Sequence, residues 1–99
     1  MRLDVNQRRM IRDEVASLMG PAAEVRLFGS RVRDGALGGD VDLLVELPVP
    51  VADPAWSASR LEARLMRRLE GRRVDVLLAA PNIAEQPIHR VARAEGCML

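Results

Sequence analysis

The sequence is poor in cysteine and in aromatic residues, and it contains no lysine. Its one cysteine, Cys97, cannot form an internal disulfide, which predicts a protein of the reducing cytoplasm. Phe28 and Trp56 are the only aromatic residues, so no platform for stacking single-stranded bases is expected. The 15 basic residues are all arginine and are nearly balanced by 14 acidic ones, for a formal net charge of +1. General nucleic-acid binders usually carry a clear basic excess, so that class is excluded as well.

Long apolar runs are also missing. No stretch approaches the roughly 20 apolar residues that a membrane span needs. The first residues, Met1 to Asn6, lack the apolar segment of a secretory signal. With 99 residues, 48% of them hydrophobic, the chain is expected to fold as one globular domain over residues 1–99, without a membrane partner.

Hydrophobic periodicity predicts alternating helices and strands. Apolar residues recur at helical spacing in three segments, and short β-type runs mark the strands. The predicted helices span residues 6–19, 59–69 and 87–95, and the predicted strands span 24–28, 40–47 and 73–78, with a small edge strand at 97–99. This order predicts an α/β (α+β) domain, in which helices pack on a small mixed sheet.

Two helix starts carry capping signals. Asp4 or Asn6 can cap the first helix. Ser59-Arg60-Leu61-Glu62 matches a capping box and predicts that the second helix begins there. The prolines at 48, 50 and 54 then predict a rigid connector before it.

Two acids stand at the start of the second predicted strand. In Asp40-Val41-Asp42 the carboxylates lie at positions i and i+2, which point to the same side of a strand. Two carboxylates so close repel each other unless a cation or a donor compensates them. Mg²⁺ takes oxygen ligands and retains positions for water and phosphate, so the pair predicts a magnesium site. The alternative is that both acids lie in water at the end of a loop.

A glycine-rich connection joins the preceding strand to these acids. Gly29 allows close approach of the backbone, and the N–H groups that follow it can hold an anion. Ser30, Arg31 and Arg33 come next and can contact phosphate oxygens. Asp75, inside the third strand, adds a carboxylate where β-type packing disfavours one, although taken alone it could simply face solvent on a half-exposed sheet. Together these residues predict metal-assisted phosphoryl or nucleotidyl transfer.

This pattern resembles the nucleotidyltransferase superfamily, whose signature is a Gly-Ser pair, an Asp-x-Asp about ten residues later and a distant third carboxylate. The match is best with its shortest branch, the minimal nucleotidyltransferase (MNT) domains. Phe28-Gly29-Ser30-Arg31, Asp40-Val41-Asp42-Leu43-Leu44-Val45, Val74-Asp75-Val76 and Glu95-Gly96-Cys97-Met98-Leu99 fall as they do in that branch. The sequence departs from the pattern at Gly39, where the family often has serine, and at Asp34-Gly35, where Arg-Gly is usual.

The resemblance implies a specific activity. Such domains commonly act as antitoxins that transfer AMP from ATP to a tyrosine of a HEPN-domain ribonuclease toxin, and thereby silence it. Carried over, Asp40, Asp42 and Asp75 would ligate Mg²⁺ in a two-metal site, and Asp75 would act as the base. The triphosphate would bind Gly29 and Ser30, with Arg31 and Arg33 as further phosphate contacts, and the toxin would form a hetero-oligomer with this chain.

Two other functions stay open at this stage. The chain could neutralise its partner by occlusion, as a catalytically inactive binding module. It could also be a small-molecule nucleotidyltransferase, although 99 residues leave no room for the second domain that those enzymes use to hold an acceptor.

The remaining notable residues are expected to serve structure or to face solvent. We expect His89 to be a surface or partner-contact residue, Trp56 a packing anchor and Cys97 a small buried residue. The five arginines on or next to the second helix are expected to form a solvated face; they are Arg60, Arg64, Arg67, Arg68 and Arg72.

Overall fold

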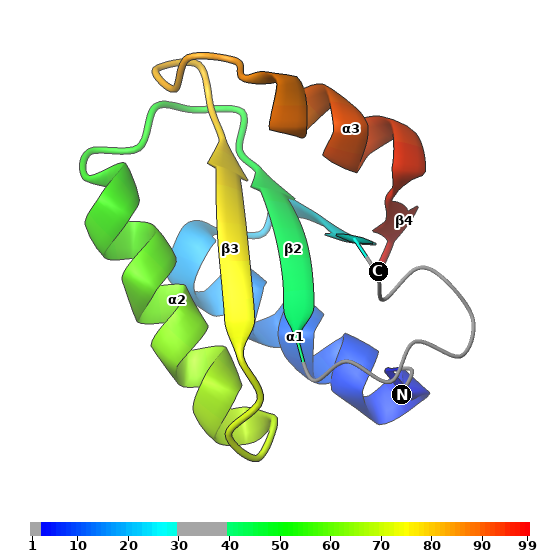
Figure 1. Cartoon of the computed structure of the whole chain (residues 1–99). Coiled ribbons are helices and arrows are strands. Elements are labelled where there is room, and N and C mark those ends of the chain that lie inside the picture. The colour runs from blue at the N-terminus through cyan, green and yellow to red at the C-terminus, as the bar shows by residue number, and fades with distance from the viewer. Residues whose placement is uncertain (1–2, 30–39) are drawn as a thin grey trace.

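A computed structural model describes the chain over residues 3–29 and 40–99. Helices and strands alternate along the chain as the periodicity predicted (Figure 1). The elements are α1 (Val5–Met19), β1 (Glu24–Phe28), β2 (Val41–Glu46), α2 (Pro54–Arg68), β3 (Val74–Ala79), α3 (Pro87–Glu95) and β4 (Cys97–Met98). The α+β class, with helices on a small mixed sheet, is therefore confirmed.

The four strands form one sheet in the order β3-β2-β1-β4. β1 runs antiparallel to both β2 and β4, whereas β2 and β3 are parallel. Parallel neighbours need a crossover connection, and α2 supplies it between β2 and β3. β3 therefore stands at one edge of the sheet, beside the strand that carries Asp42.

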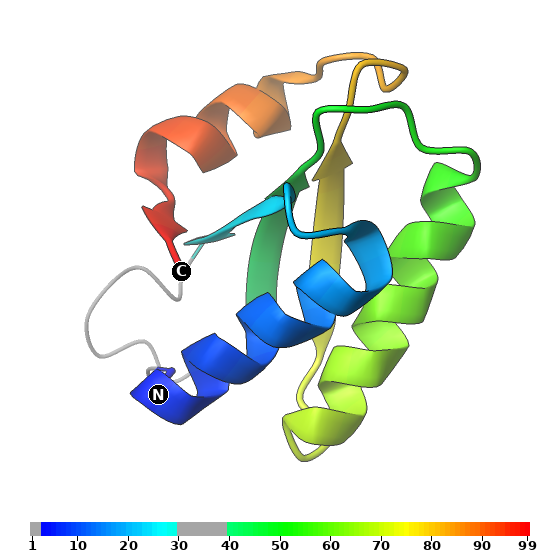
Figure 2. The ribbon, with the colours of Figure 1, turned by 180° about the vertical axis from the view of Figure 1, so that it is seen from behind.

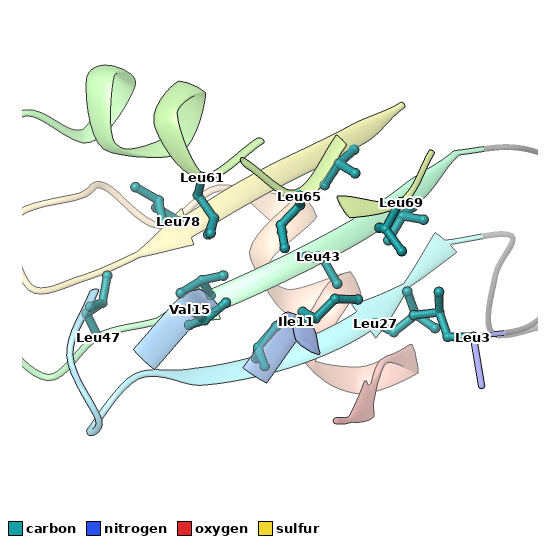
Figure 3. Close-up of a cluster of buried hydrophobic side chains, with 14 residues drawn as sticks. Leu3, Ile11, Val15, Leu27, Leu43, Leu47, Leu61, Leu65, Leu69 and Leu78 are labelled. Atoms are coloured by element: carbon teal, nitrogen blue, oxygen red, sulfur yellow. The ribbon is translucent and has the colours of Figure 1, made fainter. Parts of the chain in front are cut away.

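The main core lies on the face of the sheet that α1 and α2 cover. Val41, Leu43 and Val45 alternate along β2 and are completely buried on this face. Figure 3 shows Leu43 of β2 among side chains from both helices, and Figure 2 shows α1 crossing this face. The buried cluster consists of Leu3, Ile11, Val15, Val25, Leu27, Val41, Leu43, Val45, Leu47, Leu61, Leu65, Leu69, Val74 and Leu78.

The opposite face of the sheet carries a smaller core under α3. Leu44 of β2, Ala79 of β3 and Ala92 of α3 form its buried cluster, against which Phe28 and Leu77 pack. Strand alternation puts Asp42 and Asp75 on this same face, two residues before Leu44 and Leu77 respectively. One face thus holds most of the apolar packing, and the other carries the predicted site residues.

The helix boundaries test the capping predictions. Asp4 caps α1 in a capping box with Gln7, and Gly20 forms its C-cap, as expected. The predicted start of the second helix at Ser59 is wrong, because α2 begins at Pro54. Asp53 is its N-cap and accepts a hydrogen bond from the Trp56 N–H, while proline suits the first turn, where its missing N–H costs nothing. Ser59 therefore lies inside the helix.

Two arginines of α2 form ion pairs with a buried acid of α1. Glu14 of α1 is buried, with 8% exposure. It accepts hydrogen bonds from Arg64 Nε at 2.9 Å and from Arg68 Nη1 at 2.7 Å. Because a buried carboxylate is costly unless it is paired, these two arginines compensate it and join α1 to α2. Both arginines remain partly in solvent, with side chains 38% and 56% exposed, so the expectation of a solvated arginine face holds but omits this pairing.

Three further side chains lie where the sequence did not predict them. Trp56 is 64% exposed rather than a packing anchor, and Cys97 is exposed rather than buried. His89 is 2% exposed, so it is a core residue and not a surface one. None of the helices in the described part of the chain is long and apolar enough to cross a membrane.

Candidate active site

Three residues form a row across the sheet at the end where β2 begins. In the antiparallel pairing of β1 and β2, Phe28 is the register partner of Asp42; in the parallel pairing of β2 and β3, Asp42 is the partner of Asp75. Directly paired residues project from the same face, and neighbouring strands lie about 4.8 Å apart. The fold therefore brings two predicted site acids, 33 residues apart in sequence, side by side.

Gly29 lies directly against the carboxylate of Asp42. A Cβ added at Gly29 would come within 2.5 Å of Asp42 Oδ2, which is closer than real Cβ atoms approach an oxygen. The φ angle of Gly29 is 75°, in the left-handed region that glycine adopts most readily. Both observations explain why the first residue after β1 is a glycine, and they place its backbone beside the acid.

The other predicted site residues are placed only in part. Asp40 is exposed and directly precedes β2, where the Val41 N–H donates to the Arg73 carbonyl at 2.9 Å. Asp42 is half-buried, and Val41 between the two acids is completely buried on the other face. Ser30, Arg31 and Arg33, the remaining predicted phosphate contacts, lie outside the described residues.

Asp75 has an arginine as its neighbour. The Nε of Arg73 lies 3.4 Å from Asp75 Oδ1 and also 3.4 Å from Oδ2. The two side chains are 71% and 48% exposed, so this ion pair faces solvent. The sequence analysis missed Arg73, although the i, i+2 rule that related Asp40 to Asp42 also relates Arg73 to Asp75.

The donor chemistry of the three acids fits Mg²⁺, which prefers carboxylate oxygen and phosphate ligands. Asp42 and Asp75 lie on paired strands of one face, and the Gly29 backbone leaves room that a side chain would fill. Within residues 3–29 and 40–99, however, no group of three or more His, Cys, Asp or Glu side chains is arranged to hold a metal ion. Asp42 and Asp75 are thus neighbours in the sheet, but the described acids do not form a group of three metal ligands.

Charged side chains form a network of ion pairs at the other end of this face. Glu46 of β2 forms ion pairs with Arg26 of β1 and, at 2.9 Å, with Arg93 of α3. Arg93 also donates to Glu85 at 2.6 Å. Its hydrogen bond lowers the pKa of Glu85, and the hydrogen bonds to Glu85 and Glu46 raise the pKa of Arg93. The network fixes α3 to the sheet beyond the site acids.

Comparison with known families identifies the class of this domain. Residues 8–95 match the sequence profile of the family described as nucleotidyltransferase domain. The chain belongs to that family. Nucleotidyltransferases move a nucleotidyl group to an acceptor. The row of acids and the glycine beside it lie within the matched residues. A search of curated proteins found no match to the sequence.

Solved structures share the nucleotidyltransferase fold of this chain. A crystal structure of a mutant of the toxin–antitoxin pair MntA–HpeT has 20% identity and a TM-score of 0.65, over 96% of this chain and 71% of that one. A complex of tri-AMPylated Shewanella oneidensis HEPN toxin with MNT antitoxin has 18% identity and a TM-score of 0.57, over 92% and 70%. A further Shewanella oneidensis structure has 16% identity and a TM-score of 0.63, over 97% and 71%.

Proposed function

We propose that this nucleotidyltransferase domain is an antitoxin that transfers AMP from ATP to a tyrosine hydroxyl of a HEPN-domain toxin. The observation that carries the proposal is the register of Asp42 with Asp75 beside the Gly29 backbone. The similarity in fold to a complex of an AMPylated HEPN toxin with an MNT antitoxin supports the choice of acceptor.

In this proposal Asp40, Asp42 and Asp75 hold Mg²⁺. When bound, Mg²⁺ would supply electrostatic stabilisation of the charge that develops on the phosphate oxygens. The Gly29 backbone, free of a side chain, allows the triphosphate to approach Asp42 closely. Ser30, Arg31 and Arg33 follow Gly29 in sequence and are proposed as further phosphate contacts.

Asp75 is the proposed base for the acceptor hydroxyl. The tyrosine oxygen forms a bond to the α-phosphorus of ATP, while the bond from that phosphorus to the bridging oxygen of pyrophosphate breaks. The hydroxyl proton moves to a carboxylate oxygen of Asp75, which is 48% exposed and therefore accessible to a partner. The products are tyrosine-linked AMP and pyrophosphate.

The test uses a property of the sequence itself. The chain contains no tyrosine, so every AMP–tyrosine linkage in a mixture must lie on the partner. Purified protein is incubated with Mg²⁺, ATP labelled at the α-phosphate and a candidate HEPN protein, and the products are mapped by mass spectrometry. We expect AMP on a tyrosine of the HEPN protein; absence of label, with both proteins folded and bound, would overturn the proposal.

A matched pair of variants assigns the transfer to this site. Asp42→Asn removes a ligand charge and is expected to reduce transfer at least about 100-fold, because metal-dependent charge stabilisation is lost. Asp13→Asn makes the same change at an exposed position of α1, which packs on the opposite face of the sheet, and is expected to leave transfer unchanged. Equal losses in both variants would contradict the assignment.

Occlusion is the competing outcome. The described acids are adjacent without forming a metal-ready cluster, which is what an inactive binding module would also show. A variant with both Asp40→Ala and Asp42→Ala separates the two functions. If it transfers no AMP yet still neutralises the toxin, binding alone is sufficient and the enzymatic proposal is wrong.

A further inference from the structure

Arg73 lies on the face of the sheet that carries the candidate active site. It directly precedes β3 and stands two residues before Asp75, so both side chains project from the same face. Its carbonyl accepts a hydrogen bond from the Val41 N–H at 2.9 Å, which sets it beside the start of β2 and hence beside Asp40. A cation therefore stands beside Asp75, one of the three acids that the proposed metal site requires.

The contact between Arg73 and Asp75 involves both carboxylate oxygens. Nε lies 3.4 Å from each of them, and the guanidinium therefore lies against the oxygens that a metal ion would bind. Arg73 partly compensates the charge of Asp75, so a metal ion that binds the same oxygens competes with it.

We propose that Arg73 is a positioning residue, the resting counter-ion of Asp75, which a divalent metal displaces when the three-carboxylate site forms. This inference rests on the proposed function, since it concerns the same metal site. Arg73 holds Asp75 in a charge-compensated state without nucleotide and leaves it when the metal ion enters.

Displacement is easy because the pair is exposed. The Arg73 side chain is 71% exposed, so it can turn into solvent without disturbing the core. Exposed ion pairs are weak, which makes Arg73 a modest competitor rather than a block. The freed guanidinium remains next to a site that collects phosphate oxygens, which suit its donors. Metal and nucleotide should therefore bind cooperatively, because the nucleotide gives the displaced arginine a new partner.

The test measures Mn²⁺ binding to the full chain without nucleotide. Mn²⁺ shares the preference of Mg²⁺ for oxygen ligands, and free Mn²⁺ is counted by electron paramagnetic resonance. Arg73→Gln is expected to tighten Mn²⁺ binding about two- to five-fold, the range expected for loss of an exposed ion pair. Arg73→Lys, which can still pair with Asp75, is expected to stay near the wild type. Arg60→Gln removes the same charge at an exposed position of α2, which packs on the other face of the sheet. It is expected to leave Mn²⁺ affinity unchanged.

A double-mutant cycle separates competition for Asp75 from a general effect of charge. In an Asp75→Asn background, Arg73→Gln is expected to leave Mn²⁺ affinity unchanged, because the group that it competes for is gone. The same gain in both backgrounds, or no gain in either, would overturn the role of Arg73.

In the presence of ATP, Arg73→Gln is expected to raise the KM for ATP with little change in kcat.

The two proposals fail differently in this experiment. If neither the wild type nor any variant binds Mn²⁺ at millimolar concentrations, the metal-dependent function fails, and the role of Arg73 fails with it. If the wild type binds Mn²⁺ and transfers AMP but Arg73→Gln binds no more tightly, only the inference about Arg73 is wrong.

Discussion

The Val76 N–H of β3 donates a hydrogen bond of 2.8 Å to the carboxylate of Glu62 on α2. β3 is an edge strand, so this N–H would otherwise be available to a strand of another molecule. Two residues farther along, the Leu78 carbonyl is bonded to His89 Nε2 at 2.9 Å. Side chains from α2 and α3 thus form hydrogen bonds with backbone groups of β3. These groups are therefore less available to pair with a strand of another molecule.

Glu62→Ala tests this protection of the edge. The variant leaves a part-buried N–H without its partner, so we expect a loss of about 1–3 kcal/mol in the free energy of unfolding. We also expect concentration-dependent association, measured by light scattering after size-exclusion chromatography. Glu62→Gln keeps an acceptor oxygen and should lose less. Glu95→Ala, an exposed acid at the end of α3, is the control, and association of both alanine variants would refute the role of the edge.

Gly29→Ala tests the contact between backbone and acid. The added Cβ would meet Asp42 Oδ2, whereas at Gly71, whose φ is 83°, it would meet nothing within 4 Å. Both substitutions place alanine in the left-handed region, so each should cost about 1–2 kcal/mol in unfolding free energy. Only Gly29→Ala is expected to weaken Mn²⁺ binding and AMP transfer, by at least about tenfold. Equal effects of the two variants on metal binding would show that Asp42 tolerates the new side chain.

His89 is expected to be a core residue with one fixed ring tautomer. The Gln86 N–H donates to its Nδ1 at 2.9 Å, which requires Nε2 to carry the ring proton and donate to Leu78. Nitrogen chemical shifts of the imidazole should show a protonated Nε2 and an unprotonated Nδ1; the opposite tautomer would refute the assignment. His89→Ala should lower the unfolding free energy by about 2–3 kcal/mol, and Ile88→Ala, at a 45% exposed neighbour, should lower it less.

The pair of Arg93 and Glu85 predicts a dependence of stability on pH. The hydrogen bond from Arg93 lowers the pKa of Glu85 below its ordinary 4.5. A group whose pKa falls on folding stabilises the fold above its unfolded pKa, and this contribution is lost as the pH falls through the folded value. We therefore expect Glu85→Gln to be less stable than the wild type at pH 7, and the difference to shrink below pH 4.5. Urea unfolding at several pH values measures it, and a constant difference would contradict the prediction.

Local patterns predicted the elements well, and the exceptions have physical causes. Alternation along 40–47 predicted β2, because Val41, Leu43 and Val45 all point to one core. The start of α2 was wrong because two capping signals competed. Pro54, which reads as part of a connector, begins the helix after the Asp53 cap, and the capping box predicted at Ser59 lies nearly two turns too late.

The candidate site shows where sequence reasoning stops. Spacing alone placed Asp40 and Asp42 on one face, since that relation is local. It could not predict that Asp75 is the register partner of Asp42, because the register of these parallel strands depends on how the connecting helix α2 packs on the sheet. Burial of His89 was missed for a similar reason: its partners lie at Gln86 and on another element, at Leu78.

The two faces of β2 carry residues with different roles, so substitutions at neighbouring positions should have different effects. Substitutions at Val41, Leu43 and Val45 reach the main core, and in a mutational scan they should reduce the amount of folded protein. Substitutions at Asp42 should leave that amount nearly intact and abolish toxin neutralisation if transfer is the mechanism. The property that a substitution affects should thus alternate along β2 between the amount of folded protein and toxin neutralisation. A lineage could then lose catalysis by one substitution and keep the scaffold, which is a short evolutionary route from an enzyme to a binding protein.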